Sequence, residues 1–152
     1  MDAKTFRDAL GRFATGVTVV GMHTPDGPRG ITVNAFASLS LSPPLVGVSI
    51  DHGAGAHAAL QAGERYGVSV LAADQREISD RFAGRDVDPP LAWEDLAGAP
   101  VLGGALVHLG CRIVDRVVTG DHTLFVGEVE GAAVRDGAPL LYHRGRYGVD
   151  AG

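Results

Sequence analysis

The chain opens with an amphipathic pattern. Phe6, Ala9, Leu10 and Phe13 recur at spacings of three and four residues, as apolar residues do on one face of a helix. This spacing predicts an N-terminal helix of about three turns. Two further helices are expected, a short one around residues 57–61 and another over residues 74–82.

Most of the other apolar residues fall in runs typical of β-strands. Strands are predicted over residues 17–22, 45–51, 66–71, 105–118 and 123–134, with a short last strand near the C-terminus. Residues 84–100 are rich in Pro, Gly and Asp, and we expect a long surface loop there. About seven strands with three peripheral helices indicate a small, mostly antiparallel barrel. We expect a single domain over residues 1–152.

One predicted strand has an unusual polar face. Thr32, Asn34, Ser38 and Ser40 recur every second or fourth residue, so in a continuous strand their side chains would share one face. The run ends at Pro43-Pro44, which removes backbone donors and forces a corner. Four small hydrogen-bonding groups in a row suit the polyol chain and ring edges of a polar, planar ligand. The alternative is a half-exposed strand with a polar outer face.

Composition narrows the class of protein. The net charge of −5 argues against nucleic acid as a partner, because that binding depends on neutralising phosphates. No apolar run reaches the ~18 residues of a membrane span, and no signal peptide is expected. The single Cys111 cannot form an internal disulfide, which favours a reducing compartment and a cytoplasmic protein. The 22 glycines suggest turns, bulges or close approaches of the backbone to a ligand.

Four segments together resemble the short-chain flavin reductase family. They occur in the family's order and cover nearly the whole chain: residues 6–20, residues 32–45 including Thr32-Val33-Asn34-Ala35, residues 120–129 including Gly120-Asp121-His122, and residues 139–147. The resemblance implies a mainly β, FMN-binding split β-barrel, antiparallel and Greek-key-like, with a few peripheral helices. It also implies a homodimeric NAD(P)H:flavin oxidoreductase that transfers hydride from NADH or NADPH to FMN or FAD. The reduced flavin would then supply a partner monooxygenase.

The resemblance also implies the site residues. His122 would be the catalytic residue beside flavin and nicotinamide, with Tyr147 lining the nicotinamide face. The ribityl chain and ring edge would be held, partly through the backbone, by Thr32, Val33, Asn34, Ala35, Ser38, Leu39 and Ser40. Tyr142 and Arg144 would wall a ring face and attract pyrophosphate. The alternative for this last segment is a half-buried final strand.

Gly53-Ala54-Gly55-Ala56-His57-Ala58 matches the G-x-G-x-x-A pattern of dinucleotide-binding folds. The context does not fit such a fold, because the helix that follows is short and no series of βα units comes after it. A Gly-rich turn at a helix N-terminus still suits a phosphate. The flavin phosphate is therefore expected near Asp51, Gly55, Ala56 and His57. The alternative is a plain flexible turn.

This loop departs from the family's pattern. The family carries an Arg or Lys and a Ser or Thr there, where this chain has Gly53, Gly55 and Ala56. Either Arg81 or Arg85 compensates, or the flavin is held loosely as a substrate that must leave, or reductase activity has been lost. The alternatives to a reductase are thus a flavin-binding module without activity, and a split barrel that binds another ring cofactor such as a deazaflavin or haem.

The sequence offers few other candidate residues for metal binding or nucleophilic catalysis. The six histidines have no H-x-x-x-H or Cys/His spacing, so no metal site is predicted. No G-x-S-x-G motif is present, and Cys111 falls within a predicted strand, so nucleophilic catalysis is not expected.

Overall fold

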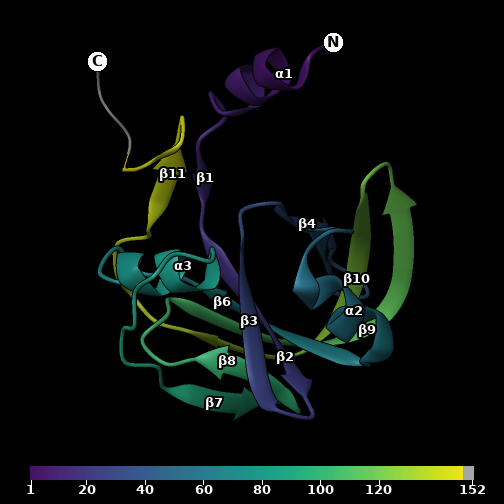
Figure 1. Cartoon of the computed structure of the whole chain (residues 1–152). Coiled ribbons are helices and arrows are strands. Elements are labelled where there is room, and N and C mark those ends of the chain that lie inside the picture. The colour runs from purple at the N-terminus through teal and green to yellow at the C-terminus, as the bar shows by residue number, and fades with distance from the viewer. Residues whose placement is uncertain (149–152) are drawn as a thin grey trace.

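The computed structural model describes residues 1–148, in which two helices pack against a curled antiparallel sheet and an N-terminal helix stands apart from it (Figure 1). The elements in chain order are α1 (Ala3–Leu10), β1 (Thr15–Gly16), β2 (Thr18–Thr24), β3 (Gly27–Val33), β4 (Phe36–Ser40), β5 (Leu45–Asp51), α2 (Gly55–Ala62), β6 (Arg65–Val70), α3 (Arg76–Phe82), β7 (Trp93–Leu96), β8 (Ala99–Leu102), β9 (Val107–Thr119), β10 (His122–Val134), β11 (Leu141–His143) and β12 (Arg146–Tyr147). No helix among these residues is long and apolar enough to cross a membrane.

The main sheet has seven strands in the order β3-β2-β6-β9-β10-β5-β4, all paired antiparallel. Its two edge strands, β3 and β4, are consecutive in the chain and only Asn34 and Ala35 join them. A link of three Cα steps spans at most about 11 Å, so the two edges come close at this end. The sheet therefore curls into a barrel that is split between β3 and β4. The predicted mainly β, antiparallel split barrel with peripheral helices is confirmed.

Two apolar clusters hold these elements together. The first fills the barrel around Tyr66 and Phe125, and α2 adds Ala56 and Leu60 to it. The second lies under α3 and joins strand residues to Phe82 of that helix. Most members of the first cluster are buried residues of the strands, whereas the second also takes Val17, Leu71 and Leu140 from the segments between strands.

A row of glycines crosses the sheet. Gly21, Gly67 and Gly110 pair with one another on β2, β6 and β9, and Gly110 pairs in turn with Gly131 on β10. The β7–β8 hairpin lies directly on this row. A Cβ on Gly67 would overlap the carbonyl oxygen of Pro100, and the same overlap recurs between Gly110 and the carbonyl of Leu96. These glycines serve a close approach of the chain to itself rather than to a ligand.

This hairpin corrects the prediction of a long loop over residues 84–100. The segment contains β7 and the start of β8, joined by a turn in which Ala97 and Gly98 have φ values of 52° and 80°. Such values belong to the two-residue turn of a β-hairpin, which usually has Asn or Asp in its first position. Because alanine is not typical of this turn position, the sequence does not predict the turn at Ala97. The Asp95 carboxylate supports it by accepting the Gly98 N–H at 3.1 Å.

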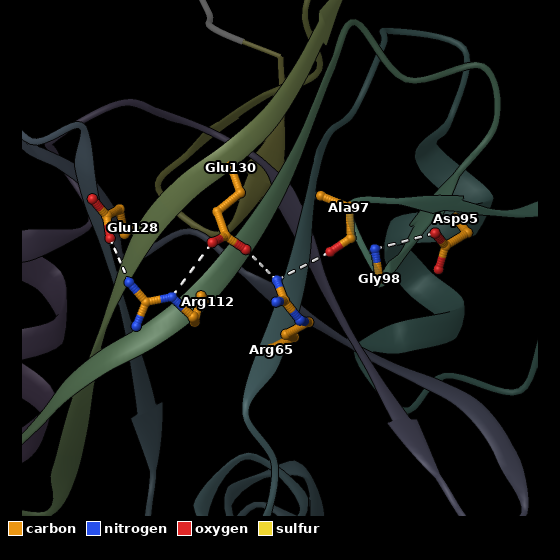
Figure 2. A network of polar contacts seen from close by, with 7 residues as sticks. All are labelled: Arg65, Asp95, Ala97, Gly98, Arg112, Glu128 and Glu130. Carbon is orange, nitrogen blue, oxygen red and sulfur yellow. Dashed lines mark hydrogen bonds and ion pairs between the residues drawn. The ribbon is translucent and has the colours of Figure 1, made fainter.

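An ionic network fastens the tip of the hairpin to the sheet. Figure 2 shows Arg65 of β6 between the Ala97 carbonyl, 3.1 Å away, and the Glu130 carboxylate. Glu130 also accepts from Arg112 at 3.4 Å, and Arg112 reaches Glu128 at 2.6 Å. The arginines lower the pKa of Glu130, with the hydrogen bond from Arg65 as the main cause. The network joins β6, β9 and β10 to a hairpin that is distant in sequence.

The N-terminal helix is shorter than predicted. It begins at the cap residue Asp2, whose carboxylate accepts the Thr5 N–H at 2.8 Å, and it ends before Gly11, so Phe13 lies outside it. No residue of α1 is buried; Phe6 is 56% exposed and Phe13 is 76% exposed. Figure 1 shows α1 standing away from the barrel. Its apolar face is therefore left without a partner in the described chain.

The prediction of one continuous strand through the Thr/Ser segment is wrong. β3 ends at Val33, β4 starts at Phe36, and the pairing of β4 with β5 shifts register between Ser38 and Ser40. The Thr32 hydroxyl donates to the Ser79 carbonyl at 2.6 Å, which fixes it toward α3. The polar residues are thus divided between two edge strands and their link, because closing the barrel requires a break here.

Candidate active site

Two hollows meet at the split in the barrel, and both are lined by Asn34 and Tyr142. The first, here called the α3 hollow, has a volume of about 480 Å³. Its polar lining comes from β3, from α3 and the turn after it, and from the C-terminal strands: Thr32, Asn34, Arg76, Ser79, Asp80, Arg85, Arg146 and Tyr147. Three arginines in one hollow suit a ligand with negative charge.

Tyr147 is held firmly in the α3 hollow. Its hydroxyl lies 2.7 Å from both Ser79 Oγ and Asp80 Oδ1, and Arg76 stacks over its ring at 4.8 Å from the centroid. Burial raises the pKa of the Tyr147 phenol above its usual range, so the ring stays neutral. A fixed, neutral aromatic ring beside a cation can wall the face of a planar ligand.

The second hollow, here called the α1 hollow, is mostly apolar and has a volume of about 550 Å³. Its lining comes from the region of α1, the link between β3 and β4, and the outer face of β5 and β10: Leu10, Phe13, Thr15, Ala35, Phe36, Gly47, Ser49, Leu124, Tyr142 and Arg144. The hydroxyl of Thr15 is buried and has no hydrogen-bond partner among residues 1–148. An unpaired buried hydroxyl costs about 1–3 kcal/mol of stability.

His122 lies at the start of β10, on the same face as Leu124 of the α1 hollow, because alternate residues of a strand share a face. It pairs across the sheet with Asp51. Its Nδ1 lies 2.7 Å from Asp121 Oδ1, and this contact lowers the pKa of Asp121. The ring is 37% exposed. It shares a strand face with the lining residue Leu124 but is not itself part of the lining.

The predicted phosphate loop connects β5 to α2. Asp51 accepts the Gly53 N–H at 2.7 Å, and His57 N donates to the Ala54 carbonyl at 3.0 Å. No acceptor for the N–H groups of Gly55 and Ala56 lies among residues 1–148. Two free amides at the start of an eight-residue helix are compatible with the predicted phosphate contact.

The histidine side chains of this loop turn away from it. Nε2 of His52 and Nε2 of His57 each lie 2.9 Å from the hydroxyl of Thr123, which is buried in β10. A threonine hydroxyl can donate to one ring and accept from the other. Thr123 thus ties the loop to the strand that carries His122.

A cation does lie at the loop, but from a residue that sequence reasoning missed. The guanidinium of Arg29, on β3, rests against Gly55, where a Cβ would lie 3.1 Å from its Cζ and overlap Nη2. Nothing in the sequence signals this contact, because β3 meets α2 only after the barrel has curled. Of the two arginines expected to compensate, Arg85 lines the α3 hollow and Arg81 lies outside both hollows.

The structure brings together only part of the predicted set. The hollows contain Thr32, Asn34, Ala35, Tyr142, Arg144 and Tyr147. The side chains of Val33 and Ala56 point into the core, so only their backbone could meet a ligand. Ser38, Leu39 and Ser40 lie along edge strand β4, outside both hollows. Residues of α3, above all Arg76, Ser79 and Asp80, were missed because their helix gives no chemical motif.

A flavin and a nicotinamide fit this arrangement. The apolar hollow suits a ring system, and the joined arginine-lined hollow suits a charged group. Among residues 1–148 no three His, Cys, Asp or Glu side chains gather as a metal site requires. Burial raises the pKa of the Cys111 thiol to about 12, which leaves it unreactive at neutral pH.

Comparison with known proteins agrees with this geometry. The family described as "Flavin reductase like domain" matches residues 10–149. The FMN reductase (NADH) SmoA of Agrobacterium fabrum is 47% identical over 150 residues, which cover 97% of this chain and 86% of that protein. NADH-dependent flavin reductase StyB of Pseudomonas fluorescens is 38% identical over 153 residues, covering 97% of this chain and 89% of that protein.

Solved structures agree as well. Flavin reductase PheA2 in its native state superposes with a TM-score of 0.95 at 41% identity, covering 100% of both chains. The NADH:FAD oxidoreductase SgcE6 of Streptomyces globisporus, solved in complex with NAD and FAD fragments, gives a TM-score of 0.91 at 39% identity and covers 99% of this chain and 93% of that one. Sequence, fold and site thus agree, and the chain belongs to the flavin reductase family.

Proposed function

We propose that this protein oxidises NADH, reduces FMN or FAD, and releases the reduced flavin to a separate monooxygenase. The observation that supports this function best is the apolar α1 hollow joined to the arginine-lined α3 hollow through Asn34 and Tyr142. A flavin ring can lie in the first, and the arginines of the second suit a negatively charged group of the nicotinamide cofactor.

When bound, the nicotinamide supplies a hydride and the flavin accepts it at N5. The protein does not need an acid for this step; it needs to hold the two rings about 3–3.5 Å apart and to exclude water. Tyr142, which lines both hollows, would face the rings, and His122 would hold the nicotinamide. Thr32, Asn34 and Ala35 would bind the ring edge and ribityl chain, with Ser38, Leu39 and Ser40 beyond them on β4.

The phosphate would meet the loop of Asp51, Gly55, Ala56 and His57 through backbone N–H groups. Asp51 would shape the loop rather than touch the ligand, since its carboxylate accepts from Gly53. Arg81 remains a predicted phosphate contact, and the α3 hollow favours Arg85 over it. Arg144 would contact the ligand in the α1 hollow and Tyr147 in the α3 hollow, with Tyr142 lining both.

We further propose a cytoplasmic homodimer in which residues 1–152 act as one domain. The exposed apolar face of α1 supports the dimer, because an eight-residue helix is marginal without packing. The buried, reduced Cys111 fits a reducing compartment.

The experiment is oxidation of NADH and NADPH by the pure protein, with and without FMN, FAD and riboflavin. We expect consumption that depends on flavin, with NADH preferred, because the relatives SmoA and StyB are NADH-dependent reductases. No consumption with any pair, together with bound flavin on purification, would instead support a binding module. If the purified protein shows the absorption spectrum of a deazaflavin or haem, the result would favour a split barrel that binds another ring cofactor.

A further inference from the structure

The loop between β5 and α2 lacks a charged side chain that could hold a phosphate: its residues are Asp51-His52-Gly53-Ala54-Gly55-Ala56. His52 of the loop and His57 of α2 bond to Thr123 instead. The loop's own cation is therefore missing, although two of its N–H groups have no acceptor within residues 1–148.

Arg29 fills this gap from another element. Its guanidinium occupies the space that a side chain at position 55 would take, since a Cβ there would overlap Nη2 and come within 3.4 Å of Nη1. Glycine at position 55 is thus what lets the guanidinium lie on the loop. The strand position is fixed as well, because Arg29 pairs with Met22 in the β2–β3 ladder.

This guanidinium is uncommitted. Within the described chain, Arg29 forms no ion pair and no hydrogen bond, and it is exposed to solvent. The nearest acidic residue in the loop, Asp51, accepts the N–H of Gly53. Other exposed arginines, such as Arg81 and Arg146, are also without an ion pair within residues 1–148, but Arg29 is the arginine whose guanidinium lies against Gly55. A free cation therefore stands beside free amides, and both can bind the same oxyanion.

We propose that Arg29 supplies the missing cation and makes this protein favour phosphorylated flavins over riboflavin. The inference rests on the proposed function, since it takes the ligand to be a flavin, and it adds how the flavin phosphate is recognised. The cation comes from β3 instead of the loop, and Gly55 is retained to make room for it.

The test is binding of FMN and of riboflavin, measured by quenching of flavin fluorescence with the pure protein at low and high salt. The variants are Arg29→Gln, Arg29→Lys and Gly55→Ala. Lys4→Gln is the control, because it removes the same charge from a side chain that is 88% exposed on α1. Circular dichroism checks that each variant folds.

We expect Arg29→Gln to weaken FMN binding by about ten- to a hundredfold, the loss of one charge-assisted contact, and to leave riboflavin binding unchanged. Arg29→Lys should keep part of the preference for FMN over riboflavin. Gly55→Ala should lower this preference without changing the charge of the protein, because the new methyl group displaces the Arg29 guanidinium. High salt should weaken FMN binding in the native protein more than in Arg29→Gln.

Equal effects of Arg29→Gln on FMN and riboflavin would overturn the inference, as would a native protein that binds both equally well. Binding is measured without NADH, so the two proposals can fail separately. A protein that prefers FMN through Arg29 but oxidises no NADH would overturn the proposed reductase alone.

Discussion

His122 is held by its neighbours rather than by a cavity. Its ring bonds to Asp121 at 2.7 Å, its strand pairs it with Asp51, and the next residue, Thr123, ties down the loop before α2. A side chain placed in this way can reach a ligand at the rim of the α1 hollow without being part of its lining.

We expect His122→Ala to lower the rate of NADH oxidation by about tenfold or more, because it removes one polar contact worth about 1.5 kcal/mol. The assay is steady-state turnover with saturating FMN, and a thermal melt checks the fold. His23→Ala is the matched control, since His23 is an exposed histidine on β2, with 58% of its side chain accessible. Turnover that stays at the native rate would contradict the role of His122.

Single residues also mark where sequence reasoning succeeds and where it stops. Thr32, Asn34, Tyr142 and Tyr147 could be found because the resemblance supplies their motifs, and the structure does bring them to one groove. Arg29 could not, because the contact that matters joins a strand to a helix 26 positions later, at Gly55. Local patterns carry no information about such a contact.

At the scale of elements, period-two and helical patterns located most strands and helices. β5 coincides with the predicted residues 45–51. The misses lie where tertiary structure overrides the pattern: the polar segment is broken by closure of the barrel, and the β7–β8 hairpin turns at an alanine. The hairpin in turn depends on the glycine row beneath it.

Gly67→Ala should therefore destabilise the fold by about 1–3 kcal/mol, the usual cost of overpacking, because its methyl group would meet Val101 Cγ1 at 2.8 Å and the Pro100 carbonyl. In a protein of this size, the loss lowers the melting temperature by about 2–12 °C. The measurement is a thermal melt followed by circular dichroism. Gly16→Ala is the control, since among residues 1–148 no atom beyond its chain neighbours lies within 4 Å of its Cβ position; equal melting of the two variants would be the contrary result.

At the scale of the whole molecule, helix α1 and the hollow beside it bear on the proposed dimer. Phe13 lines the α1 hollow and is also 76% exposed, so part of this hollow is open to solvent. The sequence predicted the helix but could not show that it would stand off the barrel, because amphipathicity gives a buried face without naming what buries it.

We expect the native protein to sediment as a dimer at micromolar concentration, and Phe6→Ser with Phe13→Ser to shift it toward monomer. The change removes two large apolar side chains from the proposed interface. Val134→Ser controls for the loss of an exposed apolar residue elsewhere, since Val134 is 79% exposed at the end of β10. A native protein that sediments as a monomer would rule the dimer out.

The glycine row has one more consequence, for how the barrel is assembled. Gly21, Gly67, Gly110 and Gly131 stand side by side only when four strands are in their correct register. A slip of one residue in any strand would bring a side chain into the row and also exchange the two faces of that strand. The β7–β8 hairpin could not then lie flat. The hairpin can therefore pack on the sheet only when the four strands are correctly aligned, although the hairpin itself is not part of that sheet.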